Sequence, residues 1–319
     1  MHEYQLIKDY FLVLSSNNKT SLKLNDDVSF DRSKQLVISV DTYVEGVHFI
    51  NFKKPDLVIK KILRSSISDL ICKGVEPKYY YISGSGNSKS FSSFNLKKIS
   101  KSLKQEQKKY KILLSGGDTV FSNKLSFSIT SVGFSKKIVL RNKAKLNDDI
   151  YVTGNLGDSF TGLQILKNKI ATSKKLKKYF ENKYYQPTLC FKLTKKLLNI
   201  ANTSIDISDG LIADLDKLIN KQKLSYKLDL DIVPISNNLK RLIAFKKLNK
   251  SSIISRGDDY QVLFTADSSK SGIINKTAQS LNIKISKIGK ICAGAQKHKI
   301  IVQKGEKIQH KHRGFYHKF

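Results

Sequence analysis

The stretch Leu36-Val37-Ile38-Ser39-Val40-Asp41 decides the fold, because apolar residues typical of a buried strand lead directly into an acidic side chain. We place Asp41 at the carboxyl end of this strand, where ligands gather in open sheets. Residues 56–72 follow with apolar side chains three and four positions apart, which predicts a helix. Gly74 and Pro77 are typical of the end of such a helix.

Strands and helices continue to alternate along the chain. Residues 111–114 predict a strand that leads into Gly116-Gly117-Asp118, whereas the Ser- and Gly-rich residues 83–93 predict a flexible loop. A second series begins with a strand over residues 150–153. Alternation in both halves predicts an α/β (α+β) protein with two domains. A polar connection over residues 139–147 places the boundary, so we expect domains of residues 1–140 and 141–319.

The composition is strongly basic, with 58 Lys and Arg against 26 Asp and Glu and a net charge of +32. Such a charge is compatible with nucleic-acid binding. However, nearly all the basic residues are lysines spread along the whole chain, without an arginine-rich arm or interleaved aromatic residues. We therefore favour a solvated, Lys-rich surface and expect no nucleic-acid partner.

The three cysteines, Cys72, Cys190 and Cys292, are far apart and form no CxxC pair, which favours free thiols in a reducing cytosol. No apolar run approaches the ~20 residues of a membrane helix. The N-terminal residues also lack the apolar core of a signal peptide. We therefore expect a cytoplasmic protein with no membrane partner.

Acidic residues are few, and several lie beside Gly, Ser or Thr near predicted strand ends. Hard cations such as Mg²⁺ take oxygen ligands and commonly accompany phosphates. Each of these residues alone is also typical of an ordinary turn, but the repeated arrangement favours a metal cluster. The candidate ligands are Asp27, Asp41, Asp69 and Asp118.

Asp206, Ser208 and Asp209 lie where a helix is expected to begin, with Ser208 as its N-cap. Free N–H groups and the helix dipole at such a place suit a phosphate. Arg141 could clamp a phosphate bidentately, and a surface role is equally compatible with the sequence. His48 is a lone histidine, which is more often structural. The chain has no Walker P-loop, so an ATP site would be of another kind.

In their order and spacing, these segments resemble the thiamine-monophosphate kinase family of the PurM-like ATP-binding superfamily. The resemblance covers almost the whole chain, from Leu24 to the C-terminus. It implies a two-domain PurM-like fold with an N-terminal ATP-binding domain and a C-terminal α/β domain. The most specific segments are residues 41–49, 115–119, 151–158, 205–211, 257–260 and 314–317.

The resemblance also implies a reaction, the phosphorylation of thiamine monophosphate to thiamine diphosphate by ATP. It implies a homodimer whose N-terminal domains pair and help to form the ATP site. Several Mg²⁺ ions would be held by Asp27, Ser39, Asp41, Asp69, Asp118, Asp206 and Asp209. ATP would be contacted by Gly117, Asp118, Arg141 and Ser208, and thiamine monophosphate by His48, Asp258 and Phe315.

Five positions depart from the family pattern: Asn25 replaces Gly, Val40 replaces a hydroxyl-bearing Thr, and Asp258 replaces the longer Glu. The other two are beside Asp258, where Arg256 replaces Gly and Gln261 replaces Glu. None of them removes a core carboxylate, so we expect an active enzyme. The nucleophile would be a phosphate oxygen of the substrate. This phosphate has a second pKa near ~6 and is largely dianionic at pH 7, so direct in-line transfer needs no general base.

Two other classes of function remain open on the sequence. One is a different PurM-like ATP-dependent synthetase, acting on a purine precursor or on selenide. Selenide chemistry usually needs an N-terminal Cys, whereas the first one here is Cys72, inside a predicted helix. The other is a basic nucleic-acid-binding protein, against which the intact set of carboxylates argues.

Overall fold

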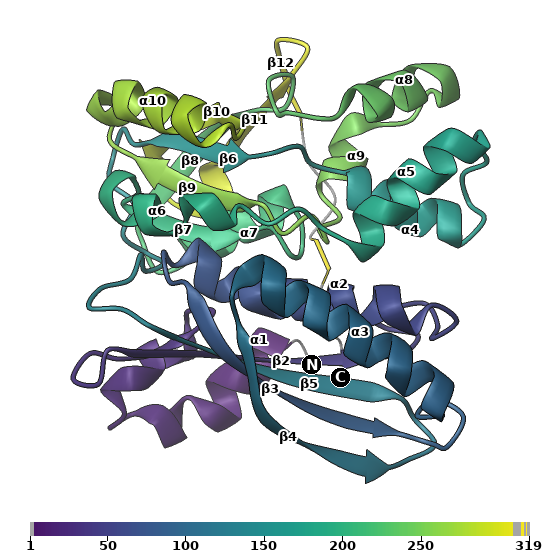
Figure 1. The fold of residues 1–319 in the computed structure, drawn as a ribbon. Helices are drawn as coiled ribbons and strands as arrows, with labels where there is room; N and C mark the ends of the chain where they lie inside the picture. The colour runs from purple at the N-terminus through teal and green to yellow at the C-terminus, as the bar shows by residue number, and fades with distance from the viewer. Residues whose placement is uncertain (1–2, 309–313, 316, 318–319) are drawn as a thin grey trace.

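The computed structural model describes residues 3–308, 314, 315 and 317, and its strands form two sheets (Figure 1). The first sheet has the order β1-β2-β5-β3-β4 and the second the order β12-β11-β8-β10-β6-β9-β7. The first consists of β1 (Ser29–Asp31), β2 (Leu36–Val44), β3 (Pro77–Gly86), β4 (Leu113–Phe121) and β5 (Ser126–Phe134). The second consists of β6 (Asp149–Thr153), β7 (Thr203–Asp206), β8 (Leu224–Asp229), β9 (Val262–Ala266), β10 (Ile285–Ala293), β11 (Ile300–Gln303) and β12 (Glu306–Lys307).

Helices occur in both parts of the chain. The α-helices are α1 (Glu3–Leu6), α2 (Pro55–Cys72), α3 (Ser93–Tyr110), α4 (Asp158–Leu166), α5 (Lys174–Tyr185), α6 (Thr194–Ile200), α7 (Leu211–Leu218), α8 (Asn237–Lys246), α9 (Lys250–Ile254) and α10 (Ser271–Leu281). Shorter helical segments are η1 (Ile7–Phe11), η2 (Val13–Ser15), η3 (Lys19–Leu24), η4 (Phe191–Leu193), η5 (Ser268–Lys270) and η6 (Gln296–His298). These elements confirm the predicted α/β (α+β) class. The boundary predicted at residue 140 falls in residues 135–148, which contain no helix or strand, and it stays a prediction.

Helix α2 lies between the two sheets (Figure 1). It packs on β2 and β5 of the first sheet and also contacts β7 and α6 of the second part. Its apolar residues Ile59, Leu63 and Ile67 are completely buried, and so is Ser66. A helix that is buried all round serves as a core element. Because α2 contacts both parts, its side chains can join residues of the first sheet to residues of the second.

The two faces of the first sheet differ in exposure. Side chains alternate along β2, so Ser39 and Asp41 lie on the face under α2, whereas Val40 lies on the opposite face. The residues of β5, β3 and β4 that pair in register with Val40 and its neighbours on that face lie on the same opposite face. We call it the outer sheet face and define it by five of its apolar side chains, each at least 40% exposed: Val40, Tyr79, Tyr81, Leu113 and Phe134.

Several strands are longer than predicted. The prediction that a strand ends at Asp41 is wrong, because β2 continues to Val44 and pairs with β5 along its whole length. Residues 83–86, predicted as part of a loop, belong to β3, and Asp118 lies within β4 instead of in a turn after it. Gly and Ser are not typical of strands. The ladder of backbone hydrogen bonds therefore holds these segments extended against their local preference.

A buried ion pair joins α2 to α3. Two guanidinium nitrogens of Arg64 donate to the Glu106 carboxylate at 2.7 and 2.8 Å, and a third donates to the Pro187 carbonyl at 3.1 Å. Both side chains are almost fully buried, at 6% and 3% exposure. An unpaired charge in such a place is costly. The pair therefore specifies how α3 and the segment at Pro187 dock on α2.

We expect Glu106→Gln to lower the free energy of unfolding by about 3–5 kcal/mol, because it leaves the buried Arg64 without its counter-charge. Urea denaturation measures this loss. Glu76→Gln is the matched control, since Glu76 pairs at 3.0 Å with a largely exposed Lys195 and is expected to contribute at most about 1 kcal/mol. Equal, small losses in both variants would contradict the assignment.

Candidate active site

Three carboxylates from distant parts of the chain meet between the two sheets. Asp27 comes from the loop before β1, Asp69 from the last turns of α2, and Asp206 from the end of β7. One oxygen of each lies within 4.8 Å of the others. Three carboxylate oxygens at this spacing are suitable ligands for a hard divalent cation such as Mg²⁺. We call Asp27, Asp69 and Asp206 the carboxylate cluster.

Neighbouring side chains hold the cluster in place. The hydroxyl of Ser39 donates to Asp69 in a short hydrogen bond, and that of Ser68 donates to Asp206 at 2.7 Å. Asp41 accepts a hydrogen bond from Tyr43 at 3.3 Å. Asp41 is not one of the three residues within 4.8 Å, but its charge raises the pKa of Asp69 and of Asp206.

Burial makes these carboxylates difficult to ionise. It raises the pKa of Asp41 to about 6 and, together with the charge of Asp214, that of Asp206 to about 7. The pKa of Asp69 is raised well above its usual value, by burial first and then by the charges of Asp41 and Asp206. A bound cation would favour the ionised forms. A cation bound here would therefore compete with protons for the carboxylates.

Two basic side chains pair with the acidic loop beside the cluster. The Lys73 ammonium lies 2.7 Å from an oxygen of Asp26 and 2.8 Å from one of Asp27. The Arg141 guanidinium contacts both oxygens of Asp27, and its backbone N–H donates to Asp26 at 2.9 Å. Arg141 is thus a partner of a predicted metal ligand. Its predicted contact with ATP stays a prediction.

Asp118 lies away from the cluster within this chain. It is in register with Ser83 of β3, which pairs with Ser128 of β5, which in turn pairs with Thr42 of β2. Residues paired in this way lie on one face of a sheet, and Thr42 is on the face opposite Asp41. Three strand spacings of about 4.8 Å put Asp118 roughly 14 Å from β2. Its role as a metal ligand stays a prediction.

Gly117 has a structural reason to be glycine. A Cβ atom at this position would lie 1.8 Å from the carbonyl oxygen of Ile82 in the neighbouring strand β3. The close approach of β4 to β3 therefore excludes any side chain at this point. The predicted contact of Gly117 with ATP is not tested by this packing.

The predicted N-cap of α7 is wrong. The N-cap is Gly210, and the Ser208 side chain makes no capping hydrogen bond. Instead, the Asp214 carboxylate reaches back and accepts from the N–H groups of Asp209 and Gly210 at 3.0 and 2.9 Å. Asp209 is paired with Lys217 in a short contact, so the structure does not bring it into the carboxylate cluster. The ligand role of Asp209 and the ATP contact of Ser208 stay predictions.

The three predicted substrate residues lie near one another. The rings of His48 and Phe315 are edge to face with centroids 6.4 Å apart, and His317 is 5.3 Å from His48. The backbone N–H of Val44 donates to His48 Nδ1 at 2.9 Å, so the neutral imidazole carries its proton on Nε2. Burial, aided by the charge of His317, lowers the pKa of His48. This group therefore offers an aromatic surface with one N–H donor.

Asp258 is held against the same group by a buried lysine. Lys61 of α2 lies 2.6 Å from an Asp258 oxygen, and the Tyr260 hydroxyl donates to that oxygen at 3.0 Å. The Lys61 ammonium also lies 4.2 Å from the ring centre of Tyr184. The carboxylate of Asp258 thus has a fixed direction and a local counter-charge. Gly257 permits this placement, because a Cβ there would lie 2.1 Å from the Ser208 carbonyl oxygen.

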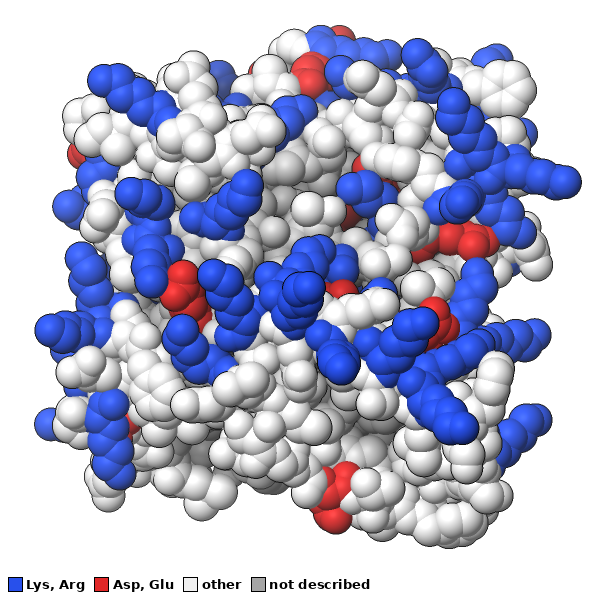
Figure 2. All heavy atoms as spheres, in the orientation of Figure 1, with Lys and Arg blue, Asp and Glu red and all other residues white. Residues whose placement is uncertain are grey.

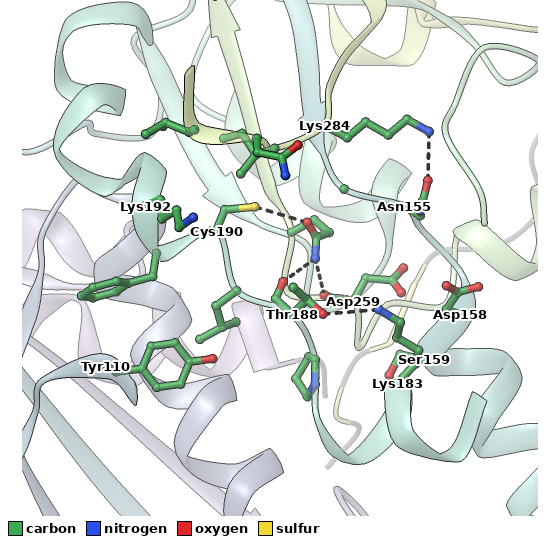
Figure 3. Close-up of a pocket in the computed structure, with 18 of the residues that line it drawn as sticks. Tyr110, Asn155, Asp158, Ser159, Lys183, Thr188, Cys190, Lys192, Asp259 and Lys284 are labelled. Carbon is green, nitrogen blue, oxygen red and sulfur yellow. Dashed lines mark hydrogen bonds between the residues drawn. The ribbon is translucent and has the colours of Figure 1, made fainter. Parts of the chain in front are cut away.

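A separate pocket of about 500 Å³ opens between the two parts of the chain (Figure 3). Tyr110 of α3 lies on one side of it, with Asn155 and Lys284 on the other. None of the predicted site residues is among the described residues that line this pocket. This pocket is therefore separate from the place where the predicted site residues gather.

Several residues of the site were not foreseen from the sequence. Asp26 and Ser68 each adjoin a predicted ligand, which is a usable signal. Lys73 and Lys61 carry no such signal, because nothing in the sequence distinguishes them from the many other lysines. Only the fold shows that these two ammonium groups are buried beside carboxylates.

Basic side chains are scattered over the visible surface and do not gather over one element (Figure 2). Such a distribution is typical of a solvated surface, and the expected lack of a nucleic-acid partner stays a prediction. Among the described helices, none has the length and apolar character required to cross a bilayer.

Comparison with known proteins yields a consistent set of relatives. Residues 24–135 match the N-terminal domain of AIR synthase related proteins. The chain is 33% identical over 299 residues to thiamine-monophosphate kinase of Haemophilus influenzae, covering 91% of this chain and 89% of that protein. It is 33% identical over 323 residues to thiamine-monophosphate kinase of Buchnera aphidicola, covering 99% and 98%.

A solved structure of AaThiL complexed with AMPPCP and TMP has a similar fold. The TM-score is 0.86 at 26% sequence identity, and the match covers 99% of this chain and 97% of that chain. Together with the AIR synthase match, this similarity confirms the predicted PurM-like fold.

The raised pKa values predict how the metal-free protein responds to pH. The pKa of Asp206 is about 7 in the native state and about 3.9 in the unfolded chain. Between these pH values the native state therefore binds one more proton than the unfolded state. Stability is then lost as pH rises through 7. Between pH 6 and 8 in EDTA we expect a loss on the order of 1 kcal/mol, or roughly 2–4 °C in Tm.

Calorimetry at the two pH values measures this shift. Asp206→Asn removes one of the titrating carboxyls and should make the profile shallower, whereas Asp267→Asn, on an exposed carboxylate, should leave it unchanged. A metal-free wild type that is more stable at pH 8 than at pH 6 would show that these carboxylates are not buried as described.

Proposed function

The chain belongs to the thiamine-monophosphate kinase family, and from this premise we propose that it transfers the terminal phosphate of ATP to thiamine monophosphate, giving thiamine diphosphate. The complex of AaThiL with AMPPCP, an ATP analogue, and TMP supports ATP as the co-substrate. The observation that carries the proposal is the meeting of Asp27, Asp69 and Asp206 from both parts of the chain, next to an aromatic group with its own carboxylate.

The carboxylate cluster fits divalent cations by its donor set, and several Mg²⁺ ions are part of the proposal. Asp27, Asp69 and Asp206 would hold them, with Asp41 and Ser39 beside Asp69. When bound, Mg²⁺ supplies the positive charge that allows two phosphate groups to approach each other. The side chains of α2 fix the separation of the ligands, because Asp69 and Ser68 reach the two sheets from one helix turn.

The chain's own residues position the acceptor. His48 and Phe315 offer ring faces for the heterocycles of thiamine monophosphate, and Asp258 offers a carboxylate oriented by Lys61. The phosphate of the acceptor is largely dianionic at pH 7 and attacks without losing a proton to the protein. Accordingly, no histidine is needed beside the cluster. We propose a direct in-line transfer, in which the bond from phosphorus to the leaving oxygen of ADP breaks as the new one forms.

We also propose that two copies pair through the outer sheet face. Val40, Tyr79, Tyr81, Leu113 and Phe134 place exposed apolar side chains on neighbouring strands, and such a patch is typical of an interface. β4 lies at the edge of this sheet with every residue exposed, including Gly117 and Asp118. Pairing would bring β4 close to the second copy, in agreement with an ATP site at which both copies meet.

The three free cysteines are compatible with action in the cytoplasm, which we retain as part of the proposal.

The test of activity is the formation of thiamine diphosphate from Mg²⁺–ATP and thiamine monophosphate, detected by chromatography. We expect Asp69→Asn to lower kcat by at least about 100-fold, because it removes charge from the cluster while preserving shape. Asp56→Asn, at the other end of α2, should retain wild-type activity. Full activity of a folded Asp69→Asn variant would refute the assignment of the cluster as a metal site. Full activity of Asp118→Asn would show that Asp118 is not one of the metal ligands.

Direct transfer has its own test. ATP with a chiral, isotopically labelled γ-phosphate should give product of inverted configuration at phosphorus. Retention, or a phosphorylated protein trapped from labelled ATP without acceptor, would contradict a single displacement.

We expect Tyr81→Arg to convert the dimer into a monomer, because it places charge in the middle of the outer sheet face. Analytical ultracentrifugation measures the mass. Phe245→Arg is the control, since Phe245 of α8 is 79% exposed and lies outside this face. A wild type that sediments as a monomer at micromolar concentration would refute the interface.

A further inference from the structure

Lys73 is the most deeply buried basic side chain near the cluster, with a relative exposure of 0%. It is the C-cap of α2, where the helix dipole favours a cation. Its ammonium lies 2.7 Å from Asp26, 2.8 Å from Asp27 and 2.8 Å from the carbonyl oxygen of Ser204. These three oxygens satisfy all three of its N–H donors. Lys73 therefore occupies a complete cation site made by the protein.

The acidic residues around it divide into two groups. Asp26 and Asp27 pair with Lys73, and Asp27 pairs also with Arg141. In the part of the chain that the structure describes, Asp41, Asp69 and Asp206 form no ion pair. One group is thus neutralised by the protein itself, whereas the other depends on a charge from solution.

From this division we propose that Lys73 is a resident counter-ion that takes the place of one divalent cation. Its ammonium fills the position between Asp26 and Asp27, so divalent ions enter only on the side of Asp69 and Asp206. The inference rests on the proposed metal dependence and deepens it, since it assigns a positioning role to a residue of this chain. It predicts fewer bound ions than the number of acidic residues suggests.

The physical reason lies in the cost of burying a charge. A divalent ion can leave, and the Asp26–Asp27 pair would then be buried without a counter-charge. An ammonium on a covalent stem cannot leave, so this half of the site remains assembled between catalytic cycles. Asp27 belongs to both groups, and Lys73 and Arg141 hold it in place for the ion that Asp69 and Asp206 share.

The experiment counts bound Mn²⁺ by electron paramagnetic resonance in wild type and in Lys73→Met, which keeps the length of the side chain and removes its charge. We expect Lys73→Met to bind one more Mn²⁺ per chain than wild type. Its Tm in EDTA should be lower than that of wild type by roughly 5–10 °C. Adding Mg²⁺ should raise the Tm of Lys73→Met by more than it raises the Tm of wild type. Lys73→Arg keeps the charge and should bind the wild-type number of ions.

A second variant covers the case in which Lys73→Met does not fold. Lys73→Met with Asp26→Asn removes the buried charge together with its partner. This double variant should fold in EDTA and bind the wild-type number of ions. An equal Mn²⁺ count in wild type and Lys73→Met, or an extra ion in the folded double variant, overturns the role of Lys73 and leaves the proposed kinase function standing. Absence of Mn²⁺ binding in every variant overturns the metal dependence itself.

Discussion

The structure depends on the concentration of negative charge in a buried place between two sheets. Asp26, Asp27, Asp69 and Asp206 converge there, and burying such a set as ions requires cations beside it. Lys73 and Arg141 supply two positive charges and join the loop before β1 to the end of α2 and to the connection between the two parts of the chain. The relative position of the two parts is therefore specified by electrostatics as well as by apolar packing.

Helix α2 holds the residues of the site at fixed positions relative to one another. Its apolar residues pack on the first sheet, while its polar residues reach into the space between the sheets. Ser68 and Asp69 occupy one turn and contact different partners, Asp206 of β7 and Ser39 of β2. Lys61, two turns earlier, orients Asp258 beside the aromatic group. One rigid element thus sets the distance between the carboxylate cluster and the residues proposed to hold the acceptor.

The proposed chemistry requires no catalytic base. A dianionic phosphate is already a nucleophile, so the barrier is the repulsion between two anions. Carboxylates that bind cations address that repulsion, and raised pKa values in the cluster keep it from remaining ionised without them. The same burial that makes the metal-free cluster unfavourable makes a bound cation effective, because charges interact more strongly where water is excluded.

The fold class, the helix over residues 56–72 and the acidic candidates were predictable, because periodicity and residue type are local properties of the sequence. The ends of β2, β3 and β4 were not, because strand pairing overrides the local preferences of Gly and Ser. The N-cap of α7 was missed for a similar reason, since Asp214 does the capping from inside the helix. The sequence by itself determined which residues carry charge and which are apolar. Only the tertiary structure decided that Asp27, Asp69 and Asp206 share one site while Asp118 lies on another face. It also decided that Lys73 is a buried counter-ion. The reason is that burial and proximity arise from contacts between segments far apart in the chain.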